Sequence, residues 1–177
     1  MTGPSASELA RWSKEAVAAD KGDPADAVDF AEIAQWGATP EEVSAEVNAI
    51  ARELGINEPI SVHFENPEGV GGALGWWNAE EKALGINQAT WEAGAGWNRL
   101  ETVAHEVMHA HQTLCHDDWK PGWDRYVKRA AESNDGTIER GSEEFWRRLW
   151  AYRHDPLEEE ATAFGREYRD RRRVHAR

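Results

Sequence analysis

The chain changes its hydrophobic pattern twice along its length. Apolar residues recur at helical spacing in the first third and again after about residue 97. Between these parts, apolar and polar residues alternate, which is typical of half-buried strands. The pattern predicts helices at 5–19, 26–36 and 39–54, strands at 60–65, 73–77 and 82–87, and helices at 97–114, 124–133, 142–152 and 156–172.

These elements predict an α+β fold in one compact domain. We expect a small, mostly antiparallel sheet of about three strands, which becomes stable only when a helix covers it. The 97–114 helix is the candidate because it follows the last strand closely. Residues 1–56 are expected to form an N-terminal helical arm.

Composition limits the kind of protein. The 177 residues carry a formal net charge of −13, which disfavours a nucleic-acid partner because an acidic body repels phosphate. The single cysteine, Cys115, excludes an intramolecular disulfide. No apolar run approaches the ~20 residues that span a membrane, and no secretory signal is visible. We therefore expect a cytoplasmic protein without a membrane partner; export by a route without a signal stays open, and the oligomeric state is not predicted.

The candidate chemistry lies within the 97–114 helix, where the sequence reads His105-Glu106-Val107-Met108-His109. Residues four apart are separated by about 40° around a helix, so both imidazoles lie on one face, one turn apart. Two such histidines can bind one zinc ion, and Glu106 lies where it can act on a water molecule at that ion. We predict that His105 and His109 are metal ligands and that Glu106 is a general base.

A catalytic zinc ion normally takes a third protein ligand. The extension that supplies a third histidine needs Gly at position 112 and His at position 115, and this sequence has Gln112 and Cys115. A glutamate from a later helix is the other common ligand. Three adjacent candidates begin the predicted last helix, and only one can face the site because neighbours are about 100° apart. They are Glu158, Glu159 and Glu160.

Three runs of this sequence resemble small gluzincin-type zinc metallopeptidases of the ImmA/IrrE-like group. They are the strand Ala73-Leu74-Gly75-Trp76-Trp77, the strand Ala83-Leu84-Gly85-Ile86-Asn87, and the helix that carries the two histidines. The pattern E-x-E-A-x-x-F also matches, from Glu158 to Phe164. The resemblance covers residues 60–165 and implies that Glu160 is the third ligand, with Glu158 in reserve.

The resemblance implies a zincin-like metallopeptidase domain over 57–177, in which 117–150 is an insertion. Its zinc ion would activate a water molecule for attack on a peptide bond, and Glu106 would take up the proton. The substrate would be a protein or peptide, and the enzyme either a regulatory protease or an effector delivered into another cell. The alternative is a non-catalytic zinc-binding interaction module.

Further details of the site stay open at this stage. An extended peptide could add to strand 83–87, where Gly85 leaves room for close approach of a backbone. Tyr152 and His154 are candidate donors to a developing oxyanion, whereas His111 is expected to face away from the metal. A partner that orients the zinc-binding histidines is unassigned; Gln112 either bonds near the site or faces solvent.

Two compositional features have structural explanations. Eight of the ten tryptophans fall between Trp76 and Trp150, and we interpret them mainly as core and covering residues rather than a substrate pocket. Residues 1–116 carry 6 basic and 19 acidic side chains, whereas 117–177 carry 14 of each. The arginines of the last helix are therefore expected either to pack against the acidic half of the chain or simply to be solvated, rather than to bind nucleic acid.

Overall fold

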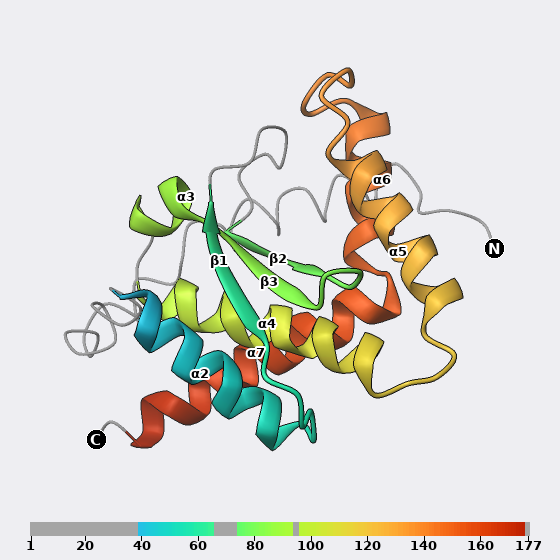
Figure 1. Ribbon diagram of the computed structural model, residues 1–177. Coiled ribbons are helices and arrows are strands. Elements are labelled where there is room, and N and C mark those ends of the chain that lie inside the picture. The colour runs from blue at the N-terminus through green and yellow to red at the C-terminus, as the bar shows by residue number, and fades with distance from the viewer. Residues whose placement is uncertain (1–38, 66–73, 94–95, 176–177) are drawn as a thin grey trace.

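The computed structural model describes residues 39–65, 74–93 and 96–175 (Figure 1). The predicted helices at 5–19 and 26–36 lie outside these residues. The elements are α2 (Pro40–Glu53), β1 (Ser61–Glu65), β2 (Gly75–Asn78), β3 (Ala83–Asn87), α3 (Gln88–Ala93), α4 (Gly96–Leu114), α5 (Lys120–Ser133), α6 (Glu143–Arg153) and α7 (Pro156–His175). The other predicted elements are all present; only the short helix α3 is additional, and α5 begins earlier than predicted.

The sheet is mixed, so the expectation of a mostly antiparallel sheet is wrong. Its strand order is β1-β3-β2, in which β3 pairs with β2 antiparallel and with β1 parallel. The tight turn after Asn78 explains the antiparallel pair, since the Asn78 side chain accepts hydrogen bonds from the amides of Glu80 and Glu81. β3 lies between the other two strands, and all five of its residues are buried.

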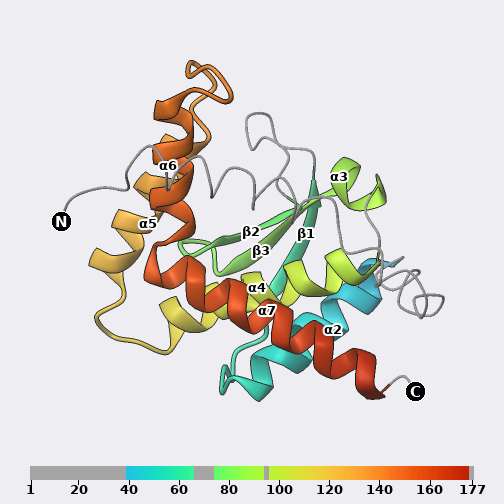
Figure 2. The same ribbon diagram turned by 180° about the vertical axis from the view of Figure 1, so that it is seen from behind.

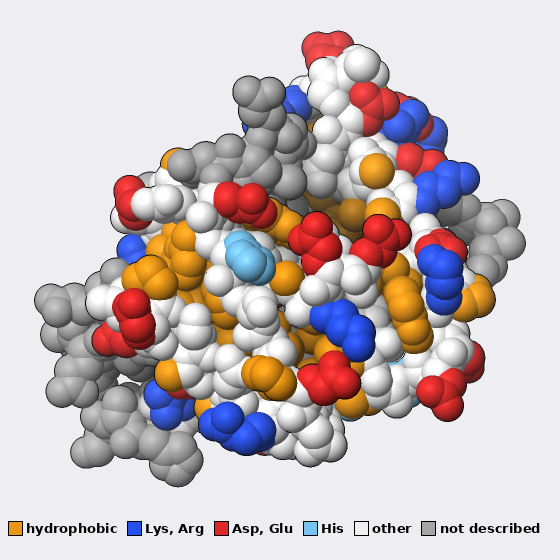
Figure 3. All heavy atoms as spheres, viewed as in Figure 1, with side chains coloured by type: hydrophobic (Ala, Val, Ile, Leu, Met, Phe, Trp, Pro, Cys, Tyr) orange, Lys and Arg blue, Asp and Glu red, His pale blue; other side chains and the backbone are white. Residues whose placement is uncertain are grey.

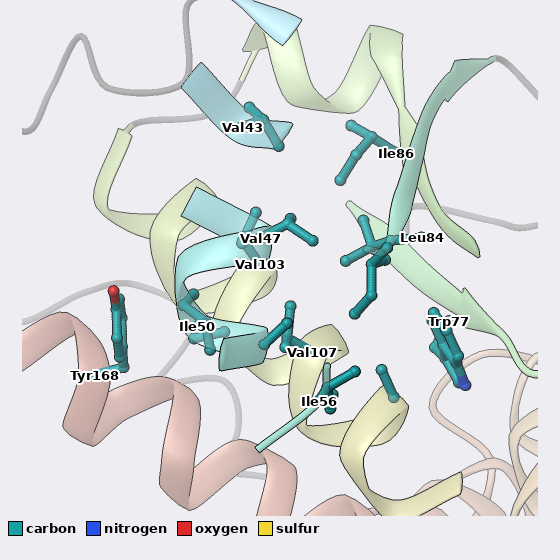
Figure 4. Close-up of a cluster of buried hydrophobic side chains, with 14 of the residues drawn as sticks. Val43, Val47, Ile50, Ile56, Trp77, Leu84, Ile86, Val103, Val107 and Tyr168 are labelled. Atoms are coloured by element: carbon teal, nitrogen blue, oxygen red, sulfur yellow. The ribbon is translucent and has the colours of Figure 1, made fainter. Parts of the chain in front are cut away.

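The core lies between this sheet and the two helices α2 and α4. Thr39 and Glu42 form a capping box that begins α2. Apolar side chains from α2, α4 and β3 meet there (Figure 4), namely Val43, Val47, Ile50, Leu84, Ile86, Val103 and Val107, none of which is exposed. Although it lies within the predicted N-terminal arm, α2 therefore belongs to the core.

α4 lies between two layers, because the sheet covers one side of it and α7 packs along another (Figure 2). Gly165 allows α7 to approach closely. A Cβ at this position would lie 2.8 Å from the backbone oxygen of Glu101 and 3.3 Å from the Cβ of His105. The close approach of the two helices therefore occurs beside one of the predicted metal ligands.

The arginines of α7 pair mainly with glutamates of the acidic half of the chain, which agrees with the first of the two expectations for them. Arg169 lies 2.6 Å from Glu101 on α4, and Arg171 lies 2.7 Å from Glu53 on α2. These ion pairs hold the C-terminal half of α7 against the body of the protein. No helix in the described ranges, α7 included, is long and apolar enough to cross a membrane.

The predicted insertion forms two helices, α5 and α6, that pack against each other and project from one end of the molecule (Figure 1). α5 also contacts the beginning of α7. The inner face of α5 carries Trp123 and Tyr126, both about nine-tenths buried. The insertion therefore brings aromatic residues to the end of α4 that carries the histidine motif.

Candidate metal centre

The structure brings the two predicted histidines together on α4. The Nε2 atoms of His105 and His109 lie 3.1 Å apart, and their rings are nearly perpendicular. His109 is 1% exposed, and the side chain of His105 is 17% exposed. The two imidazoles thus meet on one face of α4, as the spacing of one helical turn predicts, with His109 enclosed and His105 bordering solvent.

Glu158, the reserve candidate, completes the cluster in place of Glu160. Its Oε2 lies 3.5 Å from His105 Nε2 and 3.6 Å from His109 Nε2. In the described part of the chain, His105, His109 and Glu158 form the one group of three donors that could hold a metal ion. The carboxylate of Glu160 instead accepts a hydrogen bond from Gln112, and its side chain is exposed. The structure therefore does not bring Glu160 to the histidines.

The rotation of α7 about its axis explains this difference. The stripe that faces α4 consists of Glu158, Ala161, Gly165 and Tyr168, all of them buried. Glu160 is two residues from Glu158, about 200° around the helix, and lies off that stripe. The spacing of the small residues at 161 and 165 was the signal that could have selected Glu158.

The three donor atoms fit a zinc ion. Donors about 2.0–2.2 Å from a tetrahedral ion lie about 3.3–3.6 Å from one another. The three separations in this cluster are 3.1, 3.5 and 3.6 Å. Two imidazoles and one carboxylate are also a ligand set that zinc uses in catalytic sites. Two of these separations lie in that range and the third is slightly shorter, so the cluster could hold a metal ion, and its donor set is one that zinc uses.

Gln112 orients the ring of His109. The sequence alone did not identify this partner. The amide nitrogen of Gln112 donates to the Leu157 carbonyl oxygen and to Glu160, at 3.0 and 2.9 Å. Its oxygen therefore faces the Nδ1 of His109, 2.8 Å away, and must accept a hydrogen bond from the Nδ1–H group. This leaves the lone pair of His109 Nε2 directed at the cluster, as a metal ligand requires.

Attraction within the cluster changes the pKa of both kinds of ligand. Burial alone would lower the pKa of His105, but the hydrogen bond that its ring donates to Glu158 and the charges of Glu106 and Glu158 raise it above its usual value. Burial opposes ionisation of Glu158, yet the two histidines hold the pKa of this carboxyl well below its usual range. Glu158 is therefore a carboxylate at neutral pH, ready to accept a cation.

Glu106, the predicted base, borders the cluster from the same helix. It is 7% exposed, and its Oε1 lies 4.0 Å from His105 Nε2. The distance is too long for a metal ligand beside the other three, but it leaves room for a water molecule between the carboxylate and the cluster. Its position agrees with the role that the sequence predicts.

Two tyrosines, Tyr126 on α5 and Tyr152 on α6, lie beside the cluster, and only Tyr152 was a candidate from the sequence. The hydroxyl of Tyr126 is 3.0 Å from His109 Nε2 and 3.2 Å from Glu158 Oε2, and it lies 3.4 Å from the hydroxyl of Tyr152. Burial and the nearby carboxylates raise the pKa of both phenols. Both hydroxyl groups are therefore protonated and can donate hydrogen bonds.

The other two histidines considered from the sequence have different surroundings. His154 stacks on Trp150, with ring centroids 4.3 Å apart, and is exposed. His111 packs against His116, with ring centroids 5.3 Å apart. His111 therefore faces away from the candidate site, as predicted, and its ring contact explains its position.

Asp155, which the sequence analysis missed, holds the site together. It is fully buried, and one of its oxygens accepts a hydrogen bond from the amide of Leu157 at the beginning of α7. Its other oxygen lies 2.7 Å from Arg129 and 3.3 Å from Arg125, both on α5. A single carboxylate thus caps the helix that carries Glu158 and ties it to the helix that carries Tyr126.

We expect Asp155→Ala to lower the free energy of unfolding by about 2–3 kcal/mol, because it removes a helix cap and half of a buried ion pair whose arginines are partly exposed. Urea unfolding of the metal-free protein measures this change. The matched control is Asp124→Ala, also facing an α5 cation but 62% exposed, for which we expect less than about 0.5 kcal/mol. Equal effects of the two substitutions would contradict the role of Asp155.

Comparisons of this chain with protein-family models, curated proteins and solved structures found no match.

Proposed function

We propose that the protein is a zinc-dependent metallopeptidase of the gluzincin type. The observation that supports this most strongly is the triangle of donor atoms from His105, His109 and Glu158, with a second carboxylate, that of Glu106, beside the triangle but not part of it. A structural zinc site would need no such base, whereas a hydrolytic site uses three protein ligands and a carboxylate that acts on water. The resemblance to ImmA/IrrE-like peptidases agrees with this proposal.

The residues around the cluster have separate roles in the proposed reaction. Zinc, when bound, lowers the pKa of a water molecule to about 7 and polarises a carbonyl group. Glu106 accepts the proton that the attacking water loses and then delivers it to the leaving amine. Tyr126 and Tyr152, both protonated, supply hydrogen bonds to the carbonyl oxygen as negative charge develops on it. Gln112 keeps His109 in the tautomer that binds metal.

The edge for an extended peptide substrate is β2 and not β3, which lies in the middle of the sheet. The amide of Asn87 bonds to the carbonyl of Leu74, so the alternation of an antiparallel pair turns the backbone groups of Gly75 and Trp77 away from β3. In the described part of the chain, no strand pairs with that outer edge.

The expected space over Gly85 is absent, because a Cβ there would collide with the indole of Trp76.

One observation favours the alternative, a zinc-binding module without catalysis. The hydroxyl of Tyr126 lies close to two of the three ligand atoms and could close the fourth position. Glu106 weighs against this, since a structural site that closes its fourth position needs no neighbouring base. The presence of Glu106 therefore favours the enzyme.

Metal removal tests the proposed function. We expect the purified protein to cleave reduced, unfolded casein, to lose all cleavage when dialysed against a chelator, and to regain it on addition of one equivalent of zinc, because water activation depends on the ion. Mass spectrometry of the products measures cleavage, and circular dichroism verifies that the fold remains. Cleavage that persists in the metal-free protein would contradict the proposal.

A further inference from the structure

A groove of about 360 Å³ lies between the β2–β3 turn and α5. Four tryptophans and one valine supply most of its apolar lining: Trp76, Trp77, Trp119, Trp123 and Val127. Figure 3 shows apolar side chains between acidic ones where the turn faces α5. The volume is at the lower end of the range of about 300–1,000 Å³ for ligand pockets, so the groove suits one large side chain.

Trp123 connects this groove to the candidate metal centre. Its indole lines the groove, and its ring centroid lies 5.6 Å from that of His109 in an edge-to-face contact. Trp77 provides a second connection, since its indole nitrogen donates to Thr113, one turn beyond His109, at 2.8 Å. A side chain held in the groove would therefore contact Trp123, which in turn packs against His109.

The groove is open to solvent despite its apolar lining. Val127 is 46% exposed, and it is the one large apolar side chain of the described residues that is this accessible. A polar residue would be the ordinary choice at an exposed helix position. Val127 therefore extends the apolar lining of the groove to its mouth, where an apolar group from solvent can reach it.

The charged side chains at the rim of the groove indicate which residues can flank the bound apolar side chain in a substrate. Lys120 and Asp124 lie 3.2 Å apart and neutralise each other. Glu80 from the β2–β3 turn then leaves the rim negative, on a chain whose net charge is −13. A substrate with neutral or basic residues beside its apolar side chain fits this surface, and an acidic one is repelled.

We propose that this groove is the specificity subsite of the enzyme, and that it takes a large aromatic or aliphatic side chain near the bond to be cleaved. This inference rests on the proposed function, but the binding of a peptide in the groove can be measured without catalysis. Burying such a side chain contributes roughly 10- to 100-fold in affinity over alanine. In this proposal, the tryptophans of the groove form a substrate pocket, which is the role that the sequence did not favour.

The binding test uses the Glu106→Gln variant with zinc added, which prevents cleavage. Two peptides serve as probes, acetyl-Lys-Ala-Phe-Ala-Lys-amide and acetyl-Lys-Ala-Ala-Ala-Lys-amide. Indole N–H signals in nitrogen-15 NMR spectra report on individual tryptophans. We expect the Phe peptide to shift the signals of Trp76, Trp119 and Trp123 and to bind about tenfold more tightly than the Ala peptide. Equal affinity for both peptides, or shifts confined to other tryptophans, would overturn the proposal.

Two substitutions in the groove make the test specific. Val127→Gln should weaken binding of the Phe peptide about threefold, and Trp119→Ala about tenfold, because each removes apolar lining. The matched control is Lys128→Gln on the same helix, where the side chain is 76% exposed and does not line the groove, and it should leave binding unchanged. If the Val127 and Lys128 variants bind alike while the Trp119 variant keeps its affinity, the groove is not the site.

The two proposals fail in different ways. Binding in the groove without zinc-dependent cleavage by the wild type would reject the peptidase and retain the peptide subsite. Zinc-dependent cleavage without preference for large apolar residues near the cleaved bond would retain the peptidase and reject the subsite.

Discussion

Replacing Glu106 with Gln is expected to lower kcat for casein or peptide cleavage about 1,000-fold, while zinc content stays at about one ion per chain. The amide has nearly the shape of the carboxylate but cannot take a proton from water, and a general base contributes about 10²- to 10⁴-fold. Cleavage rates measured by mass spectrometry, together with metal analysis of the same sample, separate catalysis from metal binding.

The control for this substitution is Glu159→Gln, which makes the same chemical change at an exposed position next to the proposed ligand Glu158. It should keep both zinc and activity. A Glu106→Gln protein that cleaves at the wild-type rate would remove Glu106 from the mechanism. Loss of zinc from that variant would make Glu106 a ligand instead of a base.

The second large effect is expected at Glu158, where substitution by Ala should weaken zinc binding by well over 100-fold. Even the loss of a residue that only orients a ligand costs about 10- to 100-fold in metal affinity, so loss of one of three ligands costs more. The measurement is a competition titration against a zinc-binding dye. The fold should survive, because the ion pair of Asp155 that begins α7 is unchanged.

Glu160→Ala is the matched comparison, since the two residues are neighbours on one helix and differ in the direction in which they point. Glu160 touches the site only through Gln112, so its loss should cost at most about tenfold in zinc affinity. Zinc released by the Glu160 substitution and retained after the Glu158 substitution would restore the assignment that the family resemblance implies.

The local elements could be predicted because each depends on short-range signals. The helix that carries the two histidines, the turn between β2 and β3 and the start of α2 all follow from residues within a few positions of one another. The geometry of His105, His109 and Glu106 could also be predicted, since the pitch of a helix determines it.

What could not be predicted depends on contacts between distant parts of the chain. Alternation identifies a strand but not its neighbour, so the parallel pairing of β1 with β3 was missed. The choice between Glu158 and Glu160 depends on how α7 rotates against α4, which Gly165 and Asp155 determine. Tyr126 lies on α5, where no motif connects it to the site, and only the packing of α5 brings it there.

The measurement that tests the central claim most directly is X-ray diffraction of crystals grown with zinc, with data collected on both sides of the zinc absorption edge. We predict one anomalous peak at about 2.0–2.2 Å from His105 Nε2, His109 Nε2 and a carboxylate oxygen of Glu158. A peak that lies beside Glu160 and away from Glu158, or crystals without a peak between the two histidines, would contradict the account.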